Sequence, residues 1–186
     1  GEVAAAWARQ SPAEAMAWAQ SLEGSEGKNA IGRALSSWTN IRPREAAQWL
    51  DQQATPEMIG ANLPLVAGSW ATREPAAAAE WVNSHDEGEG KGDALGVVMW
   101  NWTHQDPEAA SNWLDSQPPS TSRDRGIVGL ARAAFDTDPA GAVTWAENIE
   151  DAALRQEALD IGLRAWNERD PENARVWAET NGYPLP

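Results

Sequence analysis

The chain has 186 residues, 28 acidic and 14 basic, so its formal net charge is −14. A field of that sign repels phosphate, which disfavours nucleic acid and anionic membrane surfaces as partners and favours basic or neutral proteins and peptides. Cysteine is absent, which excludes disulfides and cysteine metal sites. No apolar run is long enough to span a bilayer and no targeting segment is evident, so we expect a soluble protein whose compartment stays open.

A nine-residue phrase recurs six times along the chain and divides it into units. Its clearest copy runs from Asp106 to Leu114. Each copy has a proline, an alanine three residues later and a tryptophan six residues later. The prolines, spaced by 31 or 32 residues, are Pro12, Pro43, Pro75, Pro107, Pro139 and Pro171. A fixed period near thirty residues is typical of stacked-repeat proteins.

Each proline marks the expected start of a first helix. The residues before the prolines are Ser11, Arg42, Glu74, Asp106, Asp138 and Asp170. Aspartate or serine there predicts an N-cap, and proline suits the first helical position. Arg42 and Glu74 are weak caps, so their helices are expected to start less firmly. Apolar or small residues three, six and seven positions after the proline share one helical face, which predicts a helix of about ten residues.

A loop and then a second helical pattern follow each first helix. Ten residues after the first tryptophan, four units carry a base, at Lys28, Lys91, Arg123 and Arg155. The second pattern ends in its own tryptophan five residues before the next proline, at Trp7, Trp38, Trp70, Trp102 and Trp166. The fifth unit has Ala134 there, with Phe135 beside it. Pro64 predicts a kink in its helix.

Glycines within the second helices lower helix propensity and therefore predict places where neighbouring helices approach closely. They are Gly32, Gly68, Gly96, Gly129 and Gly162. Neither helix can bury its apolar stripe alone, whereas stacked hairpins bury both. We therefore expect an all-α fold, a right-handed α-solenoid of about 12 helices forming one domain over residues 1–186. Its tryptophans are expected to form a continuous ladder through the core.

The two ends of the array leave two interpretations open. Five complete hairpins are flanked by a second-type helix at Glu2–Arg9 and by a first-type helix at Pro171–Asn181. The chain is either a segment of a longer array, as its start at Gly1 rather than methionine favours, or its ends complement each other head to tail. The second interpretation predicts a filament or a closed ring.

The phrase Asp-Pro-x-x-Ala-x-x-Trp resembles the junction of tetratricopeptide repeats, in which a proline ends one unit and a tryptophan opens the next helix. The resemblance covers all six copies. The chain departs from the family in its period of 32 rather than about 34 residues, in lacking the Leu-Gly and tyrosine positions, and in its second tryptophan. It is thus similar to a variant, tryptophan-rich type. The resemblance implies a protein-interaction scaffold with a concave groove lined by the first helices.

The polar side of the first helices is the best candidate for a binding surface. Positions five, eight and nine after each proline hold mostly polar or acidic residues, which stacking would align into rows. The predicted binding residues in these rows are Gln48, Asp51, Gln52, Glu80, Asn83, Asn112, Asp115, Thr144, Glu147 and Asn148. Acidic rows suit a basic or neutral extended peptide. A plain solvated face is equally consistent with the pattern.

Trp100 falls outside the periodic positions. It lies two residues before Trp102, about 200° around the helix, so the two side chains cannot face the same core. Trp100 is therefore the candidate for an exposed aromatic contact, with a carbohydrate or a small cation among its possible ligands. Burial against a neighbouring unit is the alternative.

No catalytic or cofactor signature occurs in the chain. His85 and His104 are isolated and are expected to be exposed turn residues. The acidic loop Asp86–Asp93 contains Lys91 and lacks the spacing of a calcium loop. Phosphate-binding, nucleophile and dinucleotide motifs are missing. We therefore expect a non-catalytic interaction or assembly scaffold without cofactor or metal, with a self-assembling head-to-tail array and a carbohydrate- or cation-binding module as alternatives.

Overall fold

A computed structural model describes residue 7 and residues 10–88, 90–135 and 137–184, which contain eleven α-helices and no strand. The prediction of an all-α fold is thus confirmed. The short helices, which start at the prolines, are α2 (Pro12–Gln20), α4 (Pro43–Gln53), α6 (Pro75–Asn83), α8 (Pro107–Asp115), α10 (Pro139–Ala146) and α12 (Pro171–Asn181). The long helices are α3 (Gly24–Ile41), α5 (Pro56–Ala71), α7 (Lys91–Gln105), α9 (Thr121–Ala134) and α11 (Ala152–Arg169). Most of the helix expected at Glu2–Arg9 lies outside the described residues.

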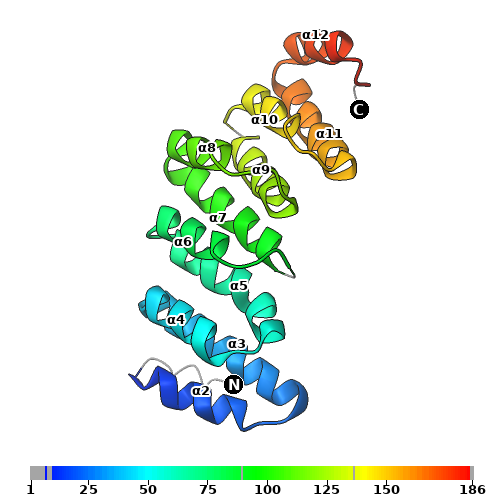
Figure 1. Ribbon diagram of the computed structural model, residues 1–186. Helices are drawn as coiled ribbons and strands as arrows, with labels where there is room; N and C mark the ends of the chain where they lie inside the picture. Colours follow the sequence, from blue (N-terminus) through cyan, green and yellow to red (C-terminus); the bar gives the residue numbers. More distant parts are fainter. Residues whose placement is uncertain (1–6, 8–9, 89, 136, 185–186) are drawn as a thin grey trace.

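The helices are arranged as an elongated stack that runs from α2 at one end to α12 at the other (Figure 1). Each long helix packs against the next one, α3 on α5, α5 on α7, α7 on α9 and α9 on α11. Each short helix packs mainly against the long helices next to it in the chain. The long helices therefore form the continuous layer that holds the described units together.

The same backbone corner joins each long helix to the next short one. At the residue before the proline, φ lies between −135° and −154° and ψ between 68° and 89° at all six corners. That residue's N–H donates to the carbonyl four residues earlier (2.7–3.1 Å), and its carbonyl accepts from the alanine N–H four residues later (3.0–3.1 Å). Proline excludes the helical conformation for the residue before it, so one residue closes both helix ends.

Side-chain capping at the corners depends on the reach of the side chain. Asp106, Asp138 and Asp170 accept the backbone N–H three residues later, as predicted. Arg42 and Glu74 make no such bond, also as predicted. The prediction for Ser11 was wrong. Side chains that end in a hydroxyl, which are shorter than aspartate, cap helices elsewhere in this chain. These are Thr55 and Ser120, where ψ is 157° and 162°. At the corners, where ψ lies between 68° and 89°, only the aspartates make the capping bond.

The corner alanines and three of the long-helix tryptophans fill the core. The alanines have no exposed surface at any of the six corners and are Ala15, Ala46, Ala78, Ala110, Ala142 and Ala174. Trp38, Trp70 and Trp102 are 6–7% exposed. The tryptophans of the short helices are only partly buried. The phrase therefore builds the corner, with its alanine deepest.

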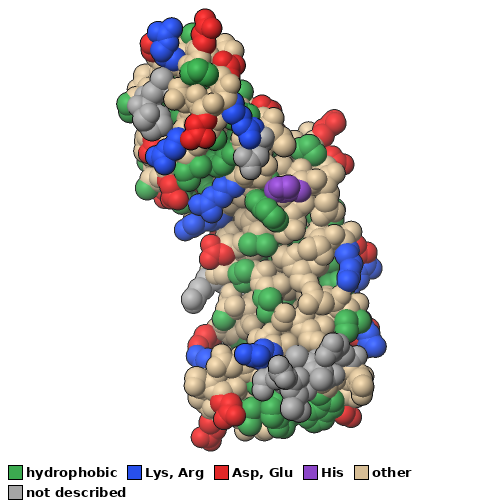
Figure 2. Space-filling view, turned by 180° about the vertical axis from the view of Figure 1, so that it is seen from behind, with side chains coloured by type: hydrophobic (Ala, Val, Ile, Leu, Met, Phe, Trp, Pro, Cys, Tyr) green, Lys and Arg blue, Asp and Glu red, His purple; other side chains and the backbone are tan. Residues whose placement is uncertain are grey.

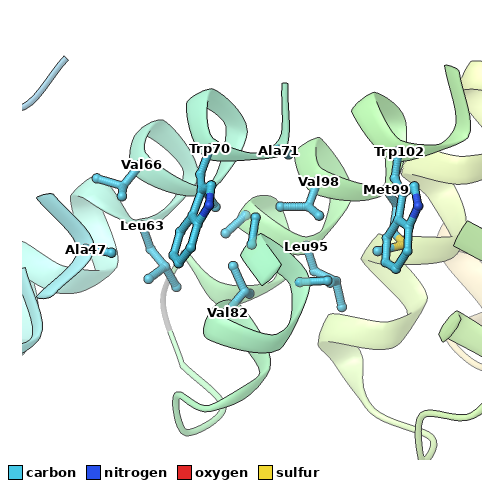
Figure 3. Close-up of a cluster of buried hydrophobic side chains, with 14 of the residues drawn as sticks. Ala47, Leu63, Val66, Trp70, Ala71, Val82, Leu95, Val98, Met99 and Trp102 are labelled. Carbon is cyan, nitrogen blue, oxygen red and sulfur yellow. The ribbon is translucent and has the colours of Figure 1, made fainter. Parts of the chain in front are cut away.

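The tryptophans meet in pairs, and the expected continuous ladder is wrong. Across five corners the ring centroids lie 5.9–6.3 Å apart at interplanar angles of 44–53°. The pairs are Trp7–Trp18, Trp38–Trp49, Trp70–Trp81, Trp102–Trp113 and Trp166–Trp177. Figure 3 shows aliphatic side chains, including Val82, Leu95 and Val98, between Trp70 and Trp102. Such a layer separates one pair from the next.

Four of the five second-helix glycines lie at close approaches, as predicted. A Cβ at Gly68, Gly96 or Gly162 would crowd Val97, the Arg125 carbonyl or Val143, respectively. A Cβ at Gly129 would overlap the backbone of Gly96, so α7 and α9 touch through their main chains. The prediction for Gly32 was wrong, because open space surrounds its Cβ position. Helix α5 runs on through Pro64, and the kink there stays a prediction.

Gly129 and Gly32 give a matched pair of alanine substitutions. Gly129→Ala forces a methyl group into the Gly96 backbone and should destabilise the protein by about 1–3 kcal/mol. Gly32→Ala meets no neighbour and gains helix propensity, so it should stabilise by up to about 1 kcal/mol. Urea unfolding followed by circular dichroism measures both. Equal effects of the two substitutions would contradict the close contact between α7 and α9.

Candidate interaction surfaces

The predicted polar rows lie exposed along the short helices, and neighbouring helices are linked through them. All ten row residues are exposed. Trp81 Nε1 donates to the Asp51 carboxylate at 3.0 and 3.3 Å. Trp113 Nε1 donates to Glu80 Oε1 at 2.7 Å. A row carboxylate of one unit thus binds the indole of the next, which ties α4 to α6 and α6 to α8.

His85 belongs to this linkage, so its prediction as an exposed turn residue was wrong. Its Nε2 lies 3.0 Å from Asp51 Oδ1 and its Nδ1 lies 2.9 Å from the Trp81 carbonyl oxygen. The imidazole stands edge-on to the Trp81 ring at 5.1 Å, and 17% of the side chain is exposed. The chain folds back after α6, which sequence spacing alone does not show. His104 is exposed as expected, but in the last turn of α7.

The other row residues make local contacts or face solvent. Asn83 Nδ2 donates to Gln117 Oε1 at 3.0 Å, which again joins two units. Asp115 lies 3.9 Å from Arg123. Thr144 and Asn148 donate to carbonyls of α10. The remaining exposed row residues are Gln48, Gln52, Asn112 and Glu147.

The periodic bases close the hairpins, a role that their spacing alone did not reveal. Lys91 Nζ donates to the His85 carbonyl at 2.6 Å, Arg123 Nε to the Leu114 carbonyl at 3.3 Å, and Arg155 Nη1 to the Ile149 carbonyl at 2.7 Å. Each base lies in the first turn of a long helix and binds a carbonyl at or just after the end of the preceding short helix, where positive charge is favourable. Lys28 departs from this pattern and pairs with Glu57, at 3.4 Å and largely exposed.

Glu74 joins α5 to α4 through a shared carboxylate. Trp70 Nε1 donates to Glu74 Oε2 at 2.8 Å. Arg44 donates to both oxygens, through Nε at 3.0 Å and Nη2 at 2.9 Å. The hydrogen bonds from Trp70 and then from Arg44 hold the pKa of Glu74 below its ordinary value, because they favour the charged form.

A groove lies between α7 and α9, and Trp100 stands at its edge. Trp100 is 46% exposed, which confirms its prediction as an exposed aromatic, and its ring lies 4.4 Å from that of His104. The groove has a volume of about 320 Å³ and is lined by Gly92, Asp93, Gly96, Val97, Trp100, Arg125, Val128, Gly129 and Arg132. Figure 2 shows one face of the stack, on which hydrophobic, basic and histidine side chains lie together near the middle. The sequence pattern points to Trp100 but not to the arginines, which come from another helix.

The described part of the chain contains neither a cluster of metal ligands nor a membrane-spanning helix. No group of three or more histidine and carboxylate side chains there could hold a metal ion. No helix in the described ranges is long and apolar enough to cross a membrane. Comparison with family models, curated proteins and solved structures finds no match. The two surfaces themselves are therefore the basis for inferring function.

The Glu74 pKa is expected to depend on the indole N–H of Trp70. Trp70→Phe removes that donor while keeping an aromatic ring, so the pKa of Glu74 should rise toward its ordinary value. Because the folded-state pKa lies below the unfolded one, the bond contributes stability above the ordinary glutamate pKa, and this contribution is lost as the pH falls through the folded value. Carboxyl carbon NMR titration measures the change.

Trp38→Phe is the matched control for this substitution. Arg42 occupies the position of Glu74 at that corner, and the Trp38 indole N–H has no acceptor among the described residues. Trp38→Phe should leave the pKa of Glu74 unchanged. A Glu74 pKa that is the same in wild type and in Trp70→Phe would contradict the assignment of the indole as its main partner.

Proposed function

We propose that this chain is a non-catalytic protein-interaction scaffold that binds a basic or neutral extended segment along the polar side of its short helices. The observation that carries the proposal is the pair of indole–carboxylate bonds, Trp81 to Asp51 and Trp113 to Glu80. They fix neighbouring short helices relative to each other, so that the polar rows of α4, α6 and α8 are aligned. Repeat proteins commonly use such extended surfaces for binding.

Charge supports a basic or neutral partner. Row carboxylates stand on three successive short helices and at the C-cap of the fourth, at Asp51, Glu80, Asp115 and Glu147. The net charge of −14 attracts cationic segments over a longer range. A carboxylate has more acceptor sites than one indole N–H occupies, so Asp51 and Glu80 retain capacity for a ligand.

The resemblance of the repeated phrase to tetratricopeptide junctions also supports an interaction scaffold, without specifying a ligand. The alternative of head-to-tail assembly depends on the helix at the N-terminal end, most of which lies outside the described residues. Sedimentation velocity over a wide concentration range separates the two functions. A mass that rises with concentration would favour assembly over a monomeric scaffold.

The proposal predicts that a basic peptide binds through the row carboxylates that make no indole bond. The probe is a fluorescein-labelled octapeptide of alternating lysine and serine, and binding is measured by anisotropy. Neutralising both carboxylates with Asp115→Asn and Glu147→Gln should weaken binding by about tenfold. Each exposed charge pair contributes somewhat under about 1 kcal/mol of binding free energy, and the loss of two such pairs gives that change in affinity.

The control is the double variant Glu108→Gln and Glu172→Gln. It makes the same change in net charge on exposed short-helix residues outside the rows. The control should bind the peptide as wild type does. Equal weakening in both double variants would show that only the general negative field attracts the peptide, and undetectable binding to wild type would also refute the proposed surface.

A further inference from the structure

The groove between α7 and α9 carries positive charge in an acidic protein. Its lining includes two arginines, Arg125 and Arg132, and one aspartate, Asp93, a formal charge of +1 where the whole chain carries −14. Within the described ranges, Arg125 has no hydrogen-bonding or ion-pair partner. Arg132 has a contact of 3.5 Å with Glu157, and both side chains are more than half exposed. Such an exposed pair contributes little, so both guanidinium groups are available to an anionic ligand.

The groove also offers apolar surface that solvent reaches. Trp100 is 46% and Val97 is 39% exposed, unlike most residues of that size in this chain. Val128 and the backbones of Gly92, Gly96 and Gly129 complete the lining. At the adjoining contact between α5 and α7 the space is filled instead, because the Val97 side chain lies over Gly68. The groove therefore has room for an apolar side chain beside the indole.

The spacing of the arginines suits an extended peptide. Arg125 and Arg132 are seven residues apart on α9, which separates them by about 10 Å along the helix axis. An extended chain in the polyproline II conformation has three residues per turn and rises about 3.1 Å per residue, so residues i and i+3 lie on the same side about 9 Å apart. Two acidic residues separated by two others would thus reach both arginines. The volume of about 320 Å³ is at the lower end of the range for ligand pockets, which fits one or two apolar side chains.

We propose that this groove binds a short, extended, acidic segment of a partner protein. Its two carboxylates pair with Arg125 and Arg132, and an apolar side chain between them packs against Trp100. Arginine is suited to this because its planar fork binds carboxylates bidentately. The site goes beyond the proposed function, since none of the polar row residues lines it and it selects the opposite charge.

The probe for this site is a fluorescein-labelled octapeptide, Gly-Ser-Glu-Leu-Trp-Asp-Ser-Gly, and its amide counterpart has Gln and Asn in place of Glu and Asp. Anisotropy should show the acidic peptide binding at least about tenfold more tightly than the amide peptide, as expected for charge-assisted hydrogen bonds. Arg125→Glu and Trp100→Ala should each weaken acidic-peptide binding by about tenfold or more. Circular dichroism checks that each variant is folded.

Arg164→Glu is the control for Arg125→Glu. Arg164 is exposed on α11, outside the groove, and its substitution changes the net charge by the same amount. It should leave acidic-peptide binding unchanged. Equal weakening by the two charge reversals, equal binding of the acidic and amide peptides, or no binding of either would overturn the proposal.

Two further readouts test other occupants of the groove. Self-association that Trp100→Ala abolishes would make a second copy of this chain the occupant, and quenching of tryptophan fluorescence by neutral sugars that the same substitution abolishes would indicate a carbohydrate site. Either result would overturn the proposal. Arg125→Glu should leave binding of the lysine–serine peptide unweakened. The failure of one surface is thus distinguishable from the failure of the other.

Discussion

The contact between two indoles, found across five of the six proline corners, is the interaction on which the rest of the structure depends. The corner residue ends one helix and begins the next with nearly the same φ and ψ each time. The tryptophans five residues before and six residues after the proline are thereby brought to about 6 Å of each other at five corners. Tilted aromatic pairs at this distance are favourable beyond the area that they bury. The same tilted indole pair thus recurs along the stack.

The surfaces of the molecule follow from this arrangement. The short-helix tryptophans are only partly buried, and at Trp81 and Trp113 the indole N–H reaches a carboxylate of the preceding unit. Those bonds link α4 to α6 and α6 to α8, the short helices on which Asp51, Glu80 and Asp115 lie. The long helices approach each other closely at Gly96 and Gly129, and beside that contact the arginines and Trp100 line a groove. The molecule therefore presents acidic residues along its short helices and a local basic groove between two long helices.

The sequence was sufficient to predict the features that repeat along the chain. It was insufficient for features that depend on the length of a side chain or on residues of another helix. The period located the helices and the alanines, and the angle between Trp100 and Trp102 predicted which indole is exposed. Local spacing could not show that Ser11 is too short to cap at this corner. It also could not show that aliphatic layers separate the tryptophan pairs, or that His85 folds back onto Asp51. Arg125 and Arg132 were missed because their importance comes from α7, a neighbour in space.

A double-mutant cycle on one tryptophan pair tests the central claim most directly. Trp102→Leu, Trp113→Leu and the double variant are compared with wild type by urea unfolding. If the pair stabilises the corner, the two substitutions should couple by about 1 kcal/mol. The control is the same cycle on Trp102 and Trp145, since Trp145 has Ala134 rather than a tryptophan across its corner; these two substitutions should show no coupling. Additive effects at Trp102 and Trp113, within about 0.3 kcal/mol, would contradict the claim that the indole contact holds the corner.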